Sequence, residues 1–322
     1  MPGLESALRL TDDKLTEDGG KVVLYEFQRQ KQKACGSLAD ATHPENDGRN
    51  RYSDVLAFDD TRVHLQVHDG SDYVNASHLT SRPGEGPSWH IIATQGPLPT
   101  TIEHFWQMVW EQHSAVVVML TCCVESNHVK CANYFAEDAG KALHSGALRV
   151  DTASVHVLDD DIILRELLIT PRSDPTAPPR RVRHYHYHAW PDRSVPAHAF
   201  SLRQLSRNLA THISNSQAPG AVDPPGPPVV HCSAGIGRTG VLCTVVIAML
   251  RLRAVEPRDG LACRQAVSVK RIVAALRKQR AGMVQTFEQY RFCYQCIKEE
   301  LQEQLGQPPL RLERPSMRNS LT

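Results

Sequence analysis

The stretch VVHCSAGIGRTG, residues 229–240, joins a short apolar run to a second and longer one. Val229 and Val230 are typical of the end of a buried strand, and RTGVLCTVVIAML, which begins at Arg238, is typical of a buried helix. Three glycines, an ionisable cysteine and an arginine lie between or beside these two runs. A simple turn needs neither a thiol nor a guanidinium, so the stretch predicts a strand–loop–helix unit that carries chemistry in its loop.

The loop predicts an anion site. Gly235, Gly237 and Gly240 allow the backbone to curl tightly with its N–H groups pointing inward, and the positive end of the following helix faces the same hollow. Arg238 adds a planar set of donors for two oxygens of a tetrahedral anion. Cys232 stands at the entry, where the same N–H groups and helix dipole favour its thiolate. A thiolate beneath a bound phosphate is a nucleophile aimed at phosphorus.

The alternative for Cys232 is a buried structural cysteine before a glycine-rich turn. A bare C-x5-R pattern leaves that alternative open, whereas the full string HCSAGIGRTG disfavours it, because it resembles the phosphate-binding loop of the cysteine-dependent protein tyrosine phosphatases. The resemblance covers about residues 45–300 and is closest to the single-domain, non-receptor type. Six further segments resemble family motifs in the same order: NRYSDVLAFDDTRVHL (50–65), DYVNAS (72–77), ATQGPLPTTIEHFWQMVWEQ (93–112), VKCANYF (129–135), HYHYHAWPDRSVP (184–196) and VQTFEQYRF (284–292).

The expected fold is an α/β (α+β) domain with a twisted mixed central sheet flanked by helices. Apolar residues at helical spacing predict helices over 102–110, 202–213, with Ser201 as a possible N-cap, 267–280 and 287–301, and AVVVMLT at 115–121 predicts a buried strand. KVVLYEFQRQKQ, 21–32, is a further candidate helix. We expect a flexible N-terminus over 1–20, a catalytic domain over 21–305 and a mobile C-terminal tail over 306–322.

The bulk composition excludes several classes of partner. The 322 residues include 36 Lys+Arg and 35 Asp+Glu, a formal net charge of +1, which gives no general electrostatic case for nucleic acid or membrane binding. The longest apolar runs are far shorter than the roughly 20 residues of a membrane span. Nine cysteines, an odd number, and a polar N-terminus indicate reduced thiols in the cytoplasm. We expect a monomer without a membrane anchor.

The resemblance implies a two-step reaction. Cys232 attacks phosphorus and forms a cysteinyl-phosphate, while Arg238 grips the equatorial oxygens. Asp192, in the WPD loop with Trp190, protonates the departing tyrosyl oxygen. Gln285 then positions water, and Thr239 donates its hydroxyl to the sulfur. The resemblance implies no cofactor and no metal.

Gln289 has two interpretations that the sequence leaves open. The resemblance implies that it assists Gln285 in positioning water. Thr286 to Gln289 also has the spacing of a helix capping box, which would make Gln289 a structural residue.

The resemblance also implies how phosphotyrosine binds. Tyr52 lines one wall of a deep slot, and Asp54 accepts N–H groups of the bound peptide. Lys130 meets the closed WPD loop. The phosphate oxygens bind the backbone of Ser233, Ala234, Gly235, Ile236 and Gly237. Four residues support the site from behind or beside it: His231, Glu125, Tyr134 and Trp190. The expected ligands are tyrosine-phosphorylated proteins or peptides, and phosphate, vanadate or similar oxyanions.

Two departures concern specificity. Ser53 stands where close relatives often have a basic residue, which weakens any preference for acidic residues beside the phosphotyrosine, although Arg193 can partly compensate. Arg277 matches an arginine near a secondary phosphate pocket, with Arg29 as a weak partner candidate. The alternative for Arg277 is a solvated arginine at a helix end.

Two other patterns are discounted. His184, His186 and His188 alternate and could face one side of a strand as zinc ligands, but they lead directly into the WPD loop. Cys293 and Cys296 form a lone C-x-x-C inside a predicted helix, where core packing is the expected role.

Three functions remain to be separated: a tyrosine phosphatase, an inactive relative that only binds phosphotyrosine, and a phosphatase for phosphoinositides or phosphoserine and phosphothreonine. Cys232, Arg238 and Asp192 are all present, which favours the enzyme over the binding module. Tyr52 favours phosphotyrosine over the other substrates, because it predicts a deep slot.

Overall fold

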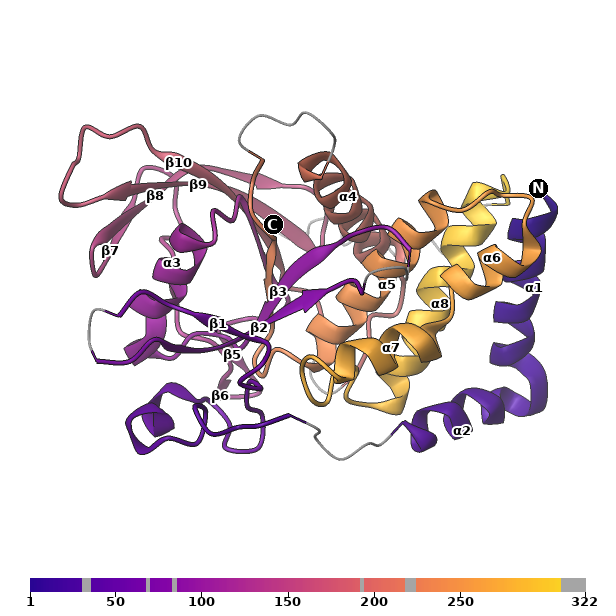
Figure 1. The fold of residues 1–322 in the computed structure, drawn as a ribbon. Coiled ribbons are helices and arrows are strands. Elements are labelled where there is room, and N and C mark those ends of the chain that lie inside the picture. Colours follow the sequence, from indigo (N-terminus) through magenta and orange to yellow (C-terminus); the bar gives the residue numbers. More distant parts are fainter. Residues whose placement is uncertain (31–35, 68–69, 83–85, 192–193, 218–223, 308–322) are drawn as a thin grey trace, which may run out of the picture.

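The structure is a computed structural model that describes residues 1–30, 36–67, 70–82, 86–191, 194–217 and 224–307. Within these residues, nine strands form one sheet in the order β1-β2-β3-β11-β4-β10-β9-β8-β7 (Figure 1). The strands of this sheet are β1 (Arg62–His64), β2 (Tyr73–Thr80), β3 (His90–Thr94), β4 (Val116–Met119), β7 (Ala142–Ser145), β8 (Leu148–Val157), β9 (Ile162–Pro171), β10 (Arg180–Tyr187) and β11 (Val229–His231). A separate hairpin contains β5 (Val124–Glu125) and β6 (His128–Val129).

The centre of the sheet is parallel and its flanks are antiparallel. β11 pairs in parallel with both β3 and β4, and β10 pairs in parallel with β4. The remaining pairs, β1 with β2, β2 with β3, β10 with β9, β9 with β8 and β8 with β7, are antiparallel. The predicted twisted mixed sheet is therefore confirmed. The carboxyl ends of β3, β4, β10 and β11 meet at one edge, where open α/β sheets place their ligand sites.

Helices cover both faces of the sheet. α3 (Ile102–Glu111) packs on one face, where Val117 and Met119 of β4 join its apolar side chains. Val116 and Val118 point the other way, into a larger cluster with the remaining helices. Burial on both faces explains why the central strands are continuous apolar runs. The other helices are α1 (Pro2–Thr16), α2 (Lys21–Arg29), α4 (Phe200–Ser216), α5 (Gly237–Arg253), α6 (Gly260–Ala266), α7 (Val269–Arg277) and α8 (Phe287–Gln304), with 3-10 turns η1 (Glu17–Gly20), η2 (Pro44–Arg49) and η3 (Pro99–Thr101).

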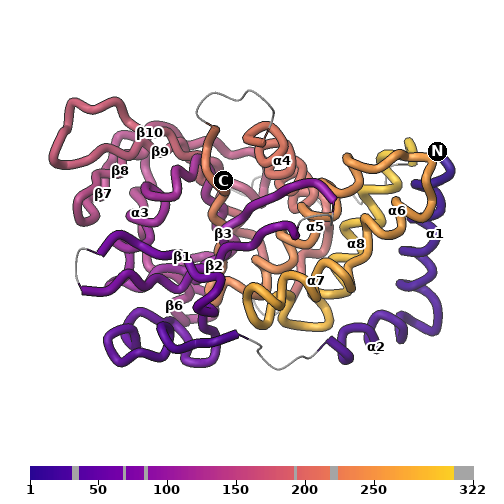
Figure 2. The backbone as a smooth tube through the Cα atoms, viewed as in Figure 1, coloured from indigo at the N-terminus to yellow at the C-terminus, as the bar shows by residue number. Residues whose placement is uncertain are grey.

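The N-terminus differs from the prediction. Residues 1–20, expected to be flexible, contain α1, whose Leu4, Ala7 and Leu15 are buried in the larger apolar cluster. α1 packs against α6 and α8, and α2 packs against α8, so the N-terminal helices lie beside helices from the C-terminal part of the described chain (Figure 2). The sequence pattern did not reveal this because the partners of α1 lie about 250 residues away. Of the expected C-terminal tail, 308–322 lie outside the described residues.

Helix boundaries mostly follow the predicted spans. α3 and α8 begin at the predicted residues, α7 begins two residues after the predicted start and ends three residues before the predicted end, and the candidate helix at 21–32 contains α2. Ser201 is not an N-cap: α4 begins at Phe200, and Ala199 holds the cap position without a side-chain hydrogen bond.

Candidate active site

The phosphate-binding loop runs from the end of β11 to the start of α5, as the sequence predicted. Gly235 has φ of 72°, and a Cβ there would lie 2.1 Å from the carbonyl oxygen of Thr94. A Cβ on Gly240 would lie 2.3 Å from the amide nitrogen of Val284. Only glycine fits these two positions, so the loop is pressed between the end of β3 and the segment before α8.

Cys232 lies at the floor of this loop. It is 6% exposed, and the backbone N–H of Gly235 donates a hydrogen bond to its Sγ at 3.3 Å. α5, which has 17 residues, begins five residues later at Gly237. The amide and the positive end of the helix dipole both favour negative charge at the sulfur.

Arg238 is held by a carboxylate on the β5–β6 hairpin. Its Nη1 and Nη2 donate to Oε1 and Oε2 of Glu125 at 2.6 and 2.7 Å, and Nη1 also donates to the backbone carbonyl of Leu120 at 3.0 Å. Burial alone would raise the pKa of the Glu125 carboxyl, but the hydrogen bonds and charge of Arg238, with bonds from Thr121 and Cys122, hold it below its ordinary value. Glu125 therefore stays ionised and fixes the plane of the guanidinium.

A buried hydrogen-bond chain runs behind Cys232. His231 Nδ1 lies 3.0 Å from the carbonyl oxygen of Cys232, Tyr134 Oη lies 2.6 Å from His231 Nε2, and His184 Nε2 lies 2.8 Å from Tyr134 Oη. Burial lowers the pKa of His231 to about 4 and raises the pKa of Tyr134 well above its ordinary value, so both groups are neutral near pH 7.

Because His231 and Tyr134 are neutral, the direction of each hydrogen bond in this series can be assigned. A carbonyl only accepts, so His231 Nδ1 donates and its Nε2 must accept from Tyr134. The Tyr134 oxygen then accepts from His184 Nε2. These hydrogen bonds thus connect His184 on β10 with the backbone of Cys232. β10 leads directly to the WPD segment.

Tyr52 contacts the loop from the opposite side. Ser233 Oγ donates to the backbone carbonyl of Lys130 at 2.8 Å, so the Tyr52 hydroxyl, 2.9 Å from Ser233 Oγ, donates to Ser233. Arg51, which sequence reasoning missed, ties this segment down by donating to the carbonyl oxygens of Gly96 and Pro97 at 2.9 and 2.6 Å. Asp54 is exposed.

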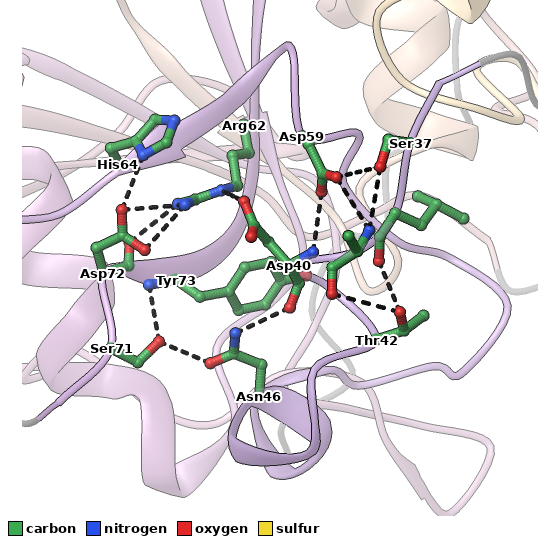
Figure 3. A network of polar contacts seen from close by, with 12 residues as sticks. Ser37, Asp40, Thr42, Asn46, Asp59, Arg62, His64, Ser71, Asp72 and Tyr73 are labelled. Atoms are coloured by element: carbon green, nitrogen blue, oxygen red, sulfur yellow. Dashed lines mark hydrogen bonds and ion pairs between the residues drawn. The ribbon is translucent and has the colours of Figure 1, made fainter.

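A polar network anchors the chain that leads to Tyr52. Arg62, 5% exposed at its side chain, lies between two carboxylates: Nε donates to Asp40 Oδ2 at 2.7 Å and Nη2 to Asp72 Oδ1 at 2.9 Å (Figure 3). Ser71 donates to Asn46 Oδ1 at 2.7 Å, and Asn46 Nδ2 donates to the Asp40 carbonyl at 2.9 Å. These bonds connect η2 to β1 and β2 and so set the position of the segment that follows.

Gln285 and Gln289 lie next to the phosphate-binding loop. A Cβ on Gly237 would lie 2.9 Å from Gln289 Nε2 and 3.3 Å from Gln285 Oε1. Gln289 also forms the capping box: its Oε1 accepts from the amides of Gln285 and Thr286 at 3.0 and 3.3 Å, while Thr286 Oγ1 accepts from the Gln289 amide. Gln289 therefore caps α8 through its Oε1, and its Nε2 remains next to Gly237 of the phosphate-binding loop.

Arg277 has a role that the sequence did not predict. Nε donates to the Met283 carbonyl, Nη2 to the Val284 carbonyl and Nη1 to the Gln30 carbonyl, at 2.9, 2.8 and 2.6 Å. It is therefore not a solvated helix-end arginine, and its donors hold the segment before Gln285. Val284 has φ of 59°, a strained value for a β-branched residue, which this clamp helps to maintain. Arg29 lies over the ring of Tyr25 instead.

Arg280, unlike Arg277, was not singled out in the sequence. It is fully buried, and it donates to the carbonyl oxygens of Gly235 and Ala234 at 3.0 and 3.1 Å and to Asn75 Oδ1 at 2.7 Å. Burial lowers its pKa to about 10, so it stays charged at neutral pH. It fixes the back of the loop and turns the loop amides toward the hollow.

Two more of the predicted residues, Thr239 and Trp190, are buried. Thr239 is buried, and its hydroxyl has no hydrogen-bond partner among the residues that the structure describes, so the expected bond to the sulfur is not made here. Trp190 is buried, and its Nε1 donates to the Ser194 carbonyl at 3.0 Å. Asp192 and Arg193 lie outside the described residues.

The two discounted patterns lie in the described part of the chain. Across the described ranges, no group of three His, Cys, Asp or Glu side chains could hold a metal ion, and the His184–His188 alternation is among the residues searched. Cys293 and Cys296 are buried in the core. No helix in the described part of the chain is long and apolar enough to cross a membrane.

Comparison with known proteins agrees with this geometry. A family model described as "Protein-tyrosine phosphatase" matches residues 46–299. Receptor-type tyrosine-protein phosphatase H of Homo sapiens is 39% identical over 278 residues, which are 85% of this chain and 23% of that protein. Protein-tyrosine-phosphatase PTP1 of Arabidopsis thaliana is 39% identical over 267 residues, 82% of this chain and 73% of that protein. Tyrosine-protein phosphatase non-receptor type 18 of Homo sapiens is 38% identical over 270 residues, which are 82% of this chain and 53% of that protein.

The chain thus spans between about a quarter and three quarters of the length of these relatives, which include receptor and non-receptor types. The family model covers well over half of the chain and includes the Cys232 loop, the β5–β6 hairpin and the segment before α8. The sequence and the geometry lead to the same conclusion: the chain belongs to the protein-tyrosine phosphatase family.

Proposed function

We propose that this protein hydrolyses phosphotyrosine in proteins through a cysteinyl-phosphate. The observation that carries the proposal is the pairing of Cys232, beneath the Gly235 amide, with Arg238, whose two terminal nitrogens are held in one plane by Glu125. This arrangement offers a nucleophile and a planar set of donors to one tetrahedral anion.

In the first step the Cys232 thiolate attacks phosphorus and the bond from phosphorus to the tyrosyl oxygen breaks. Asp192 gives its proton to that oxygen, since a tyrosinate with a pKa of about 10 is a poor leaving group. The loop amides from Ser233 to Gly237 and the Arg238 guanidinium bind the equatorial oxygens as charge spreads over them.

In the second step water attacks phosphorus and the bond from phosphorus to sulfur breaks. Asp192 takes a proton from the water, and phosphate and the thiolate are released. Gln285, which lies beside Gly237, positions the water, and the Nε2 of Gln289 faces the same place. Thr239 would donate to the leaving sulfur after rotation of its side chain about χ1.

Tyr52 sets the substrate. Its hydroxyl is held by Ser233, so the ring forms a fixed wall at the entry to the loop. A phosphotyrosine ring is long enough to pass this wall, whereas phosphoserine and phosphothreonine are too short. We also propose Asp54 as the acceptor for the peptide backbone, Lys130 as a contact of the WPD segment, and a monomer that acts in the cytoplasm in signalling.

The test compares the wild type with Cys232→Ser and Asp192→Ala on one phosphotyrosyl peptide and its phosphoseryl analogue. We expect turnover of the phosphotyrosyl peptide only, no turnover by Cys232→Ser, and a rate for Asp192→Ala lower by about 10²–10⁴-fold. Equal turnover of both peptides would end the claim of tyrosine specificity. Full activity of Cys232→Ser would end the mechanism.

A further inference from the structure

A cavity of about 530 Å³ opens at the surface between α5, α6, α7 and the described residues Arg82, Gly86 and Pro87. Its lining includes none of the residues placed in the proposed reaction, so an inference about it does not depend on that reaction. The volume lies within the range of about 300–1,000 Å³ that is typical of small-molecule sites.

Alanines explain why the space is hollow. Ala254 follows α5, Ala262 and Ala266 lie on α6, and Ala274 and Ala275 lie on α7. Where facing helices carry only methyl groups, their side chains cannot fill the gap between the backbones. The result is an apolar wall.

The rim of the same cavity is cationic. Arg82, Arg251, Arg271 and Lys278 line it, and no acidic side chain does so among the described residues. Residues 83–85, which include Glu85, lie outside that description. Within the described chain, Arg82, Arg271 and Lys278 form no ion pair or hydrogen bond through their side chains.

The helix dipoles do not account for these charges. Lys278 follows the C-terminus of α7, where a cation is favourable. Arg271 lies in the first turn of the same helix, which contains no acidic residue, and a cation is unfavourable there. Arg271 therefore raises the positive potential of the cavity at a local cost that an anion in the cavity would offset.

We propose that this cavity is a binding site for a small organic anion, with an apolar body against the alanines and one sulfonate, phosphate or carboxylate group against Arg271, Lys278 and Arg82. An apolar floor with a few convergent charged groups is the usual composition of such sites. Charge attracts the ligand, and the apolar body distinguishes it from inorganic anions.

The test uses naphthalene-1-sulfonate as the probe, with the neutral 1-naphthalenemethanol and inorganic sulfate as comparisons. Calorimetric titration is done on the full chain as wild type, Arg271→Glu and Lys270→Glu. Lys270 is the matched control, because it is the exposed neighbour of Arg271 on α7 and does not line the cavity. Binding at the phosphate-binding loop is common to all three proteins and cancels in the comparison.

We expect Arg271→Glu to bind the sulfonate about tenfold more weakly than Lys270→Glu, which corresponds to about 1.4 kcal/mol. The neutral analogue and sulfate should bind more weakly than the sulfonate. Ala262→Leu, which fills the cavity without changing charge, should weaken binding as well. Equal affinities of the two charge variants, full affinity of Ala262→Leu, or no binding at millimolar probe would each overturn the proposal. Thermal unfolding of each variant confirms that it is folded.

Discussion

At the scale of single residues, the site depends on side chains that orient the reacting groups without touching substrate. Glu125 is the clearest of these, because both of its oxygens accept from Arg238. Arg238 can bind two phosphate oxygens in one plane only if its guanidinium is held in that plane. Glu125 therefore determines the geometry of the site although it lies outside the phosphate-binding loop.

We predict that Glu125→Gln lowers kcat/KM on a phosphotyrosyl peptide by about 10²-fold, since the amide turns an NH₂ group toward one guanidinium nitrogen and displaces it. Steady-state kinetics measures the effect. Glu45→Gln is the control, because Glu45 is exposed on η2 and contacts neither loop nor arginine. Equal kinetics of the two variants would show that Arg238 is oriented without Glu125.

Arg277 gives a prediction about the second step. Arg277→Met removes the three bonds to carbonyl oxygens and frees Val284 from its strained φ, so Gln285 loses its position. Rapid mixing should then show a burst of released tyrosine followed by a slower steady state, because the cysteinyl-phosphate accumulates. Lys270→Met, on the same helix, should show the wild-type time course. Loss of the first turnover as well would indicate a role in attack rather than in hydrolysis.

The residues that the sequence revealed and those that it concealed differ in one physical respect. Cys232 and Arg238 could be predicted because glycines, thiol and guanidinium lie within one short stretch. The contacts of Arg277 and Arg280 could not, because their acceptors are mainly backbone carbonyls, among them those of Gln30 and Gly235. Every residue type has a carbonyl, so no pattern of side chains marks such a contact.

At the scale of elements, α1 is part of the folded domain. Its buried face, with Leu4, lies against α6 and α8, and Lys14 pairs with Glu26 of α2 at 2.7 Å. The sequence analysis did not predict this packing, because α6 and α8 lie more than 240 residues from α1 along the chain. The central strand β11 and α5 were predictable for the opposite reason, because they are adjacent in sequence.

We predict that Leu4→Ala lowers the free energy of unfolding by about 2–4 kcal/mol, the usual cost of truncating a buried leucine. Urea unfolding measures it. Leu24→Ala, on α2, is the control, because Leu24 is 36% exposed and its loss should cost less than about 1 kcal/mol. A neutral Leu4→Ala would restore the idea of a flexible N-terminus.

At the scale of the whole molecule, several buried histidines act together on stability. Burial lowers the pKa of His90, His186 and His231 to about 4, and that of His184 well below its ordinary value. The unfolded chain takes up protons as the pH falls through about 6.5, whereas the folded protein does not until about pH 4. Stability is therefore unaffected by these groups above pH 6.5 and is lost between pH 6.5 and 4.

The expected slope is up to about 1.4 kcal/mol per pH unit for each such histidine. Urea unfolding at a series of pH values between 7 and 4.5 measures this slope. His231→Gln removes one titrating group and should reduce the slope by the contribution of a single histidine. His43→Gln is the surface control, as His43 is 56% exposed at its side chain. An equal free energy of unfolding at pH 6.5 and 5 would contradict the prediction.

The order of the sheet has a practical consequence for attaching cargo to the protein. The carboxyl ends of the parallel strands, β10 included, lie at the edge of the sheet that holds Cys232. The β9–β10 connection, residues 172–179, precedes β10 and therefore lies at the opposite end of that strand. With eight residues in β10 and about 3.3 Å per residue, roughly 26 Å separates that connection from the catalytic edge. A fluorescent reporter inserted into this largely exposed connection would therefore label the protein at a point remote from Cys232.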